Sequence, residues 1–126
     1  MNRVHFSSFT NNRRTPEAIY DELNKEFNFD YDPCPYQFFQ GNGLLDSWGL
    51  STFCNPPYSE IKKWIKKGYE EAQRGKCVVF LIPSRTDTSW WHDYCMKAKE
   101  IRFIRGRLKF GDAKNNAPFP SAIVIF

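Results

Sequence analysis

The sequence predicts an α/β fold built on a trimmed, mostly parallel sheet that closes with an antiparallel pair of strands. Strand-like and helix-like segments alternate along the chain, which is the pattern of a parallel sheet covered by helices. The strand-like segment at 76–83 is continuously apolar from Cys77 onward, as in a strand buried on both faces. The last two strand-like segments follow one another without a helix between them, which favours antiparallel pairing.

The composition indicates one modest folded domain. The chain has 126 residues, of which 41% are hydrophobic and 25% charged, without a low-complexity tract. Its net charge of +4 is compatible with a polyanionic partner but is weak evidence for one. Four widely spaced cysteines without a C-x-x-C pair favour reduced, buried thiols, and no metal site is expected. Neither a signal-peptide pattern nor a membrane-length apolar run is seen, so we expect a cytoplasmic protein without membrane contact.

The first helix is expected over 15–27, after a flexible basic arm at 1–14. Thr15 is the predicted N-cap, and Pro16 suits the first helical position. Apolar side chains recur every four residues and mark the buried stripe: Ile19, Leu23 and Phe27. Residues 15–126 are expected to form a single domain.

The remaining elements follow from apolar patterns bounded by prolines and glycines. The segments expected as strands are 27–32, 51–54, 76–83, 100–111 and 120–126. The segments expected as helices are 58–75, which is amphipathic and ends at Gly75, and 89–98. Residues 35–50 are expected to be irregular. Ligands of parallel sheets bind at the carboxyl ends of the strands, where Asp32, Asn55 and Ser84 are expected to emerge.

The segment Asn55-Pro56-Pro57-Tyr58 has the composition of a rigid acceptor site. The exocyclic amine of a nucleobase is a poor nucleophile because its lone pair is delocalised into the ring. The side-chain carbonyl of Asn55 and the backbone carbonyl of Pro56 would accept its two hydrogens and draw the nitrogen towards tetrahedral geometry. Tyr58 offers a face on which a flipped-out base can stack. The alternative is a turn that merely ends the strand, and the position between a strand and a helix favours the catalytic interpretation.

The motif and its surroundings resemble a known enzyme family. NPPY is the amino-methyltransferase motif of S-adenosylmethionine-dependent enzymes, and the whole chain resembles the small phage-type, Dam-like DNA N6-adenine methyltransferases. The matching stretches cover nearly all of 15–126: "TPEAIYDELNKEF", "DPCP", "FCNPPYSEIKKWIKK", "VVFLIPSRTDTSWWHDY" and "IRFIRGRLKFG…APFPSAIVIF". The resemblance implies a Rossmann-like methyltransferase fold, S-adenosylmethionine as cofactor, DNA as partner and, for a phage-encoded enzyme, the cytoplasm of the host cell.

The resemblance also implies roles for individual residues. Asn55, Pro56, Pro57 and Tyr58 would form the catalytic loop. The cofactor would be held at its methionine moiety by Thr15, Asp32, Pro33 and Cys34, and at its adenine amino group by Asp46.

Two departures from the family pattern concern the cofactor site. No G-x-G follows the first strand, and "DPCPYQ" has a proline where a glycine would let the backbone approach the ligand. Only about twenty residues separate the first strand from the NPPY strand, too few for full crossover connections. We therefore expect a trimmed sheet, an open cofactor site and weak cofactor affinity.

Basic and aromatic residues near the same edge are candidates for DNA contact. Arg85 follows the buried strand and would contact a phosphate, while Trp90 would stack on a base or fill the gap left by flipping. Arg105 and Arg107 flank a glycine in a segment that alternates basic and apolar residues, which suits phosphate contact. Trp91 is expected in the core.

The sequence thus predicts a site-specific DNA-methyltransferase (adenine-specific) that needs no metal. The flipped adenine would attack the sulfonium methyl in line through its N6 lone pair and release the surplus proton to solvent. Because no separate recognition domain is evident, we expect relaxed target specificity. Two alternatives stay open: a methyltransferase of another planar amine (cytosine N4, an RNA base or a protein glutamine), and a catalytically decayed nucleic-acid-binding module with this fold.

Overall fold

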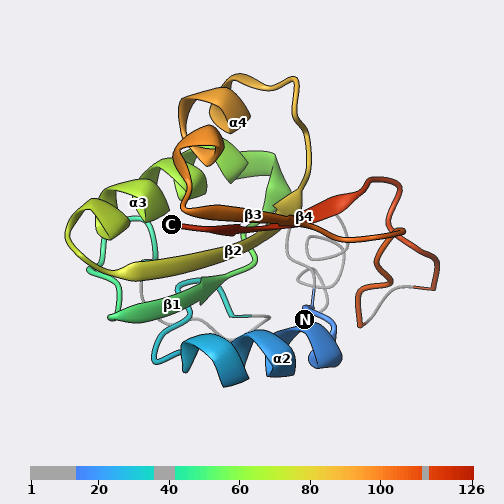
Figure 1. Ribbon diagram of the computed structural model, residues 1–126, viewed down its shortest axis with the longest axis horizontal. Coiled ribbons are helices and arrows are strands. Elements are labelled where there is room, and N and C mark those ends of the chain that lie inside the picture. The colour runs from blue at the N-terminus through green and yellow to red at the C-terminus, as the bar shows by residue number, and fades with distance from the viewer. Residues whose placement is uncertain (1–13, 36–41, 112–113) are drawn as a thin grey trace.

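The structure is a computed structural model that describes residues 14–35, 42–111 and 114–126. Within them a four-stranded sheet lies between helices on both faces (Figure 1). The strands are β1 (Ser51–Cys54), β2 (Cys77–Pro83), β3 (Glu100–Phe103) and β4 (Ser121–Ile125). The helices are α2 (Glu17–Phe27), α3 (Ile61–Gln73) and α4 (Ser89–Asp93), with 3-10 turns at Tyr58–Glu60 and Cys95–Lys97. The mixed α/β prediction is confirmed, and the predicted arm at 1–14 lies outside the described residues except for Arg14.

The sheet has the order β1-β2-β4-β3, in which β1 and β2 are parallel and the other two pairs are antiparallel. The predicted antiparallel pairing of the last two strands is confirmed. The sheet is less parallel than predicted because β4 inserts between β2 and β3 and runs opposite to both. One cross-sheet row joins Ile82, Ala122 and Phe103, so β2 and β3 end at the same edge.

Alternating side chains of the buried strands divide the core into two halves. Val78, Phe80 and Ile82 pack beneath α3 and α4, whereas Val79 and Leu81 face α2. A strand can be apolar at every position only if both of its faces are covered, so β2 confirms the expectation drawn from its sequence. The predicted core position of Trp91 is also confirmed, because this residue of α4 is buried and packs in the same half of the core as Val78, Phe80 and Ile82.

The predicted strand over 27–32 is wrong in extent. In the structure it is a single parallel bridge between Tyr31 and Thr52. Two constraints shorten it. Asn28 ends α2 in the left-handed conformation, with a φ of 51°, and Pro33 has no N–H with which to continue the ladder. Only the residues between these two points can pair with β1, and they do so through the N–H of Asp30 and the carbonyl of Tyr31.

The predicted strand over 100–111 is also too long, because β3 ends at Phe103. The N–H of Ile104 still donates to the Ser121 carbonyl at 3.1 Å. The next residue on the opposite strand is Pro120, which has no N–H to donate, and Gly106 turns the chain away with a φ of 76°. The predicted strand over 120–126 is confirmed as β4.

The helix predictions hold with corrected ends. The helix predicted over 58–75 begins with a 3-10 turn and continues as α3, and the one predicted over 89–98 divides into α4 and a second 3-10 turn. Thr15 is not the N-cap of α2, because Pro16 occupies that position without a side-chain capping bond. No helix of the described part of the chain is long and apolar enough to span a membrane.

A buried carboxylate fastens the segment before β1 to α3. Glu71 is fully buried and accepts hydrogen bonds from the Trp48 N–H at 3.0 Å, Lys67 at 2.9 Å and Lys76 at 2.6 Å. Burial alone would raise the pKa of Glu71, but these hydrogen bonds and the lysine charges lower it to about 2. The carboxylate is thus charged at neutral pH and holds the chain that leads into β1.

Candidate functional site

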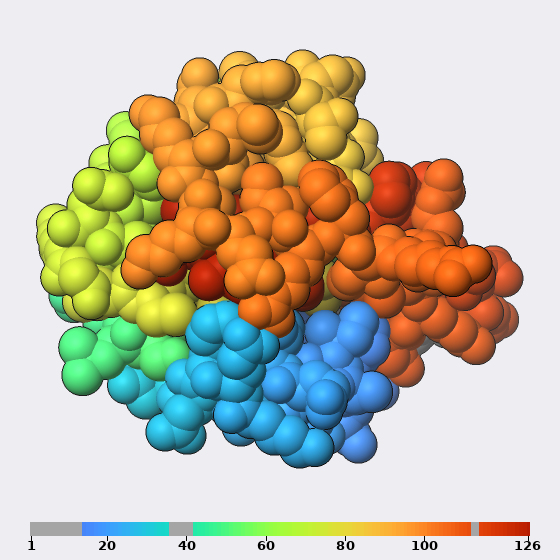
Figure 2. Space-filling view, in the orientation of Figure 1, coloured from blue at the N-terminus to red at the C-terminus, as the bar shows by residue number. Residues whose placement is uncertain are grey.

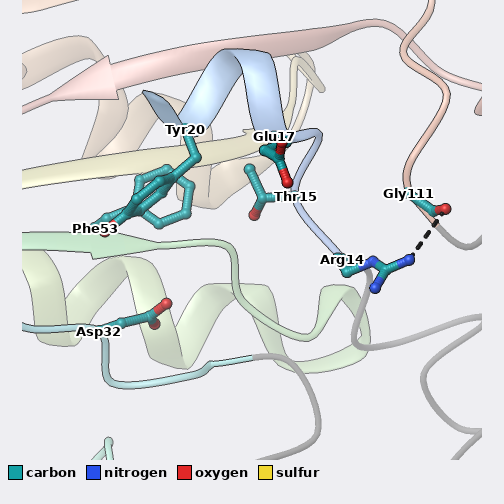
Figure 3. A pocket seen from close by; sticks show the side chains of 7 residues that line it. All are labelled: Arg14, Thr15, Glu17, Tyr20, Asp32, Phe53 and Gly111. Carbon is teal, nitrogen blue, oxygen red and sulfur yellow. Dashed lines mark hydrogen bonds between the residues drawn. The ribbon is translucent and has the colours of Figure 1, made fainter. Parts of the chain in front are cut away.

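A pocket of about 450 Å³ opens beside the carboxyl end of β1 (Figure 3). Its walls come from the start of α2, from β1 and from the loops that follow Tyr31 and Phe110. The lining residues are Arg14, Thr15, Glu17, Tyr20, Asp32, Phe53 and Gly111. Figure 3 shows the rings of Tyr20 and Phe53 at one side and the oxygen atoms of Thr15, Glu17 and Asp32 around the space. Two predicted cofactor residues, Thr15 and Asp32, therefore line one pocket.

Asn55 follows β1 directly and is 4% exposed. Its Nδ2 donates a hydrogen bond to Thr15 Oγ1 at 3.1 Å, and its Oδ1 accepts one from the Tyr58 hydroxyl at 3.3 Å. Because Thr15 also lines the pocket, this hydrogen bond connects the amide of Asn55 to the pocket wall. The strand-end prediction that brought Asp32 and Asn55 to one edge agrees with this arrangement.

The two prolines make the loop after Asn55 stiff. Pro56 is buried, and Pro57 is extended, with φ −63° and ψ 127°, just before the 3-10 turn that begins at Tyr58. Neither proline has an N–H, so neither can donate to a base or to the loop itself. The Glu60 N–H donates to the Pro57 carbonyl at 3.2 Å and closes the turn. The four predicted catalytic residues are thus held in one short, rigid segment.

The ring of Tyr58 is held by two other aromatic rings. Phe119 lies edge-on to it with 5.4 Å between ring centroids, and Phe110 lies edge-on at 6.4 Å. Both phenylalanines are buried, whereas Tyr58 is half-buried. Edge-to-face contacts of this kind stabilise aromatic pairs and fix the orientation of the ring. Tyr58 therefore has a defined orientation next to Asn55.

Asp32 is a half-buried carboxyl whose charge is only partly compensated. Its Oδ1 accepts a hydrogen bond from the Cys34 N–H at 2.9 Å. Burial raises the pKa of Asp32 to about 6, and this hydrogen bond offsets only part of the effect. A positive group placed in the pocket would stabilise the ionised form. Behind Asp32, Pro33 is buried and Cys34 packs against the α3 half of the core, where burial raises the pKa of its thiol to about 12.

Asp46 does not line the pocket that Thr15 and Asp32 share. It is exposed and accepts a hydrogen bond from the Asn42 N–H at 2.8 Å, which closes the turn at 42–46. Its predicted role at the adenine amino group stays a prediction.

Three predicted DNA-binding arginines emerge near the same edge of the sheet. Arg85 follows the end of β2, and Arg105 and Arg107 follow the end of β3; all three are exposed. Arg105 and Arg107 lie in a loop rather than in the predicted strand. In Figure 2 the orange-to-red segment that includes this loop protrudes at the right side of the molecule. The Arg85 guanidinium lies 5.8 Å from the centroid of Phe119, the same ring that contacts Tyr58.

Trp90 is placed less favourably for its predicted role. Only 7% of the residue is exposed, and it packs in the α3 half of the core against Trp91. Its predicted role in DNA contact stays a prediction.

The pocket includes five residues that sequence reasoning did not select: Arg14, Glu17, Tyr20, Phe53 and Gly111. Glu17 and Tyr20 are three residues apart, so both face the pocket from the first turns of α2. This spacing was visible in the sequence. Arg14 and Gly111 are 97 residues apart and meet through two hydrogen bonds, from Gly111 N–H to the Arg14 carbonyl and from Arg14 Nη2 to the Gly111 carbonyl. No local pattern could have predicted that contact.

The pocket has the chemistry for a zwitterionic, partly apolar small molecule. Its volume lies within the range usual for ligand sites, about 300–1,000 Å³. It combines two carboxylates, a guanidinium, two hydroxyls and two aromatic rings. Among the described residues, no three histidine, cysteine, aspartate or glutamate side chains gather as ligands for a metal ion.

Comparison with known proteins identifies the family. The model of the family described as DNA N-6-adenine-methyltransferase (Dam) matches residues 7–123, which is most of the chain. The chain therefore belongs to this family, and the resemblance inferred from its motifs is confirmed. Neither the comparison with curated proteins nor that with solved structures found a match. Membership of the family implies DNA adenine methyltransferase activity.

Proposed function

We propose that this member of the DNA N-6-adenine-methyltransferase (Dam) family transfers a methyl group from S-adenosylmethionine to the N6 amine of adenine in DNA. The proposal includes a Rossmann-like methyltransferase fold, trimmed between the Tyr31 bridge and β1. The single observation that carries it is the hydrogen bond between Asn55 and Thr15 at 3.1 Å, which joins the catalytic loop to the wall of a pocket suited to the cofactor.

The pocket residues fit the methionine end of the cofactor, which carries an ammonium and a carboxylate group. Asp32 would bind the ammonium group, because a positive charge stabilises a carboxylate whose pKa burial has raised. Arg14 and Thr15 would bind the carboxylate through charge and a hydroxyl donor. The rings of Tyr20 and Phe53 supply an apolar wall for the rest of the molecule.

The catalytic loop would act on the amine of the flipped base. The carbonyl oxygens of Asn55 and Pro56 accept its two hydrogens, which localises the lone pair on the nitrogen. Tyr58 positions the ring by stacking. S-adenosylmethionine, when bound, supplies a methyl group activated by a sulfonium. The nitrogen gains that methyl group and loses one proton to solvent, so no strong base is required from the protein.

The three exposed arginines would hold the DNA strand. Arg85, Arg105 and Arg107 follow strands that end at the edge where Asn55 also lies. Contacts with phosphates position a strand without reading its sequence. We therefore expect low target specificity, since phosphate contacts of this kind do not distinguish one sequence from another.

A methyl-transfer assay with the purified protein tests this proposal. DNA would be incubated with S-adenosylmethionine, digested to nucleosides and analysed by mass spectrometry. We expect N6-methyladenine from the wild-type protein and from Asn116→Ala, an exposed control, but none from Asn55→Ala. Detection of N4-methylcytosine, or of methylation in RNA alone, would show that the enzyme methylates a planar amine other than adenine N6 in DNA. A folded wild-type protein that neither methylates nor shows a thermal shift with millimolar S-adenosylhomocysteine would favour a nucleic-acid-binding module.

A further inference from the structure

We propose that Thr15 is a positioning residue that links the cofactor pocket to the orientation of the Asn55 amide. The inference rests on the proposed function and adds a role that cofactor contact alone does not give. Thr15 lines the pocket with its side chain and also accepts the Nδ2 hydrogen bond of Asn55 at 3.1 Å. Thr15 thus lies between the pocket and the catalytic loop.

The orientation of the Asn55 amide decides whether the loop can act. The two ends of an asparagine amide have nearly the same shape, but one end only accepts hydrogen bonds and the other only donates them. An amine with two hydrogens needs the accepting end. If the amide turned by 180°, its NH₂ group would meet the target amine, and two donors would face each other.

A hydroxyl can either accept from the NH₂ end or donate to the carbonyl end of the amide, so Thr15 alone leaves both orientations possible. The ambiguity ends when the single hydrogen of Thr15 is used elsewhere. An anionic acceptor in the pocket, such as a carboxylate, takes that hydrogen. The Thr15 oxygen can then only accept from Asn55, which keeps Nδ2 towards Thr15 and leaves the carbonyl end towards Tyr58, as in the structure.

Burial strengthens this link. Asn55 is 4% exposed, so water offers little compensation if its NH₂ group loses a partner. Thr15 itself is half-buried, and the segment that carries it is tied to the opposite loop by the Gly111 N–H at 3.1 Å. An occupied pocket would therefore organise the catalytic amide before the base arrives.

Two variants of Thr15 and one control variant separate positioning from simple cofactor contact. Thr15→Val keeps the shape but loses the hydroxyl, Thr15→Ser restores it, and Thr86→Val is a matched exposed control. At saturating cofactor and DNA we expect kcat of Thr15→Val to fall about tenfold, roughly the effect of one lost hydrogen bond, with recovery in Thr15→Ser. If Thr15 only held the cofactor, saturation would restore the wild-type kcat of Thr15→Val, and the inference would be overturned.

A second readout does not depend on activity. In a ¹⁵N NMR spectrum, the side-chain NH₂ signal of Asn55 is identified by its absence in Asn55→Ala. We expect this signal to shift in Thr15→Val and to sharpen in the wild-type protein when S-adenosylhomocysteine is added, while Thr86→Val leaves it unchanged. An unaltered signal in Thr15→Val would refute the link. Absence of methyl transfer in the wild-type protein would instead refute the proposed function, so the two failures can be distinguished.

Discussion

Replacing Asp32 with asparagine should stabilise the free protein and weaken cofactor binding at the same time. Burial raises the pKa of this carboxyl from 3.8 to about 6. An acid whose pKa is higher in the folded than in the unfolded state destabilises the fold when the pH exceeds its unfolded-state pKa. The loss of folding free energy reaches its full size when the pH exceeds the folded-state pKa. At about 1.4 kcal/mol per pKa unit, the upper bound of the penalty at pH 7.5 is about 3 kcal/mol. Asp32 is only half-buried, and solvent screening reduces this to about 1–2 kcal/mol.

Thermal denaturation at two pH values measures this effect. For a chain of 126 residues, a gain of this size raises Tm by about 4–8 °C at pH 7.5. The gain should shrink to about a third at pH 4.5, where Asp32 is already protonated in the folded state. The exposed Asp21→Asn on α2 serves as control and should change Tm little at either pH. A lower Tm for Asp32→Asn at pH 7.5, or a gain independent of pH, would refute the reasoning.

Ligand binding supplies the second half of this prediction. If Asp32 binds the ammonium group of S-adenosylhomocysteine, wild-type affinity should fall as pH drops below 6, by up to about tenfold per pH unit. Calorimetry with Asp32→Asn should show weaker binding without this pH dependence. Unchanged affinity in Asp32→Asn would remove Asp32 from the cofactor site even if the stability result held.

Three further predictions concern the core, the DNA contacts and the cofactor. Glu71→Gln should lower the free energy of unfolding by about 3 kcal/mol in urea titrations at neutral pH, because the pKa of the buried Glu71 carboxylate is lowered from 4.5 to about 2. This stabilisation should disappear only as the pH falls from 4.5 towards 2. The exposed Glu70→Gln should change it by less than about 0.5 kcal/mol, and equal effects would contradict the role of the Glu71 cluster. Replacing Arg105 and Arg107 with alanine should weaken DNA binding. The slope of the logarithm of the DNA association constant against the logarithm of the salt concentration should fall in magnitude by about 2, and an unchanged slope would show that these arginines do not contact phosphates. Calorimetry with S-adenosylmethionine should give a dissociation constant above about 1 μM, and tighter binding would disprove the open, trimmed site.

Local patterns predicted the parts of the fold that local physics controls. The apolar run within 76–83, from Cys77 onward, predicted a strand covered on both faces, and the alternation of Val78 and Val79 between the two halves of the core confirms it. The strand at 27–32 was overestimated because β-propensity does not reveal where a ladder loses its partner. There the left-handed Asn28 and the N–H-free Pro33 leave room for a single bridge.

The part of the candidate site that lies at strand ends could be predicted from the sequence. Asp32 and Asn55 end neighbouring parallel segments, and parallel segments end at one edge, so their proximity followed from the order of elements. The bond between Asn55 and Thr15 joins residues 40 positions apart and depends on how α2 packs beneath β1. Thr15 accordingly looked like a helix cap in the sequence, whereas in the structure Pro16 is the N-cap and the Thr15 hydroxyl contacts the catalytic loop.

The most direct test of the central claim is the DNA of cells that lack adenine methylation and express this protein. Digested genomic DNA would be analysed for methylated nucleosides, with Asn55→Ala expressed at the same level as control. The account predicts N6-methyladenine in DNA from cells with the wild-type protein and none in those with Asn55→Ala. Folded wild-type protein that leaves adenine unmodified, or N6-methyladenine that persists with Asn55→Ala, would contradict it.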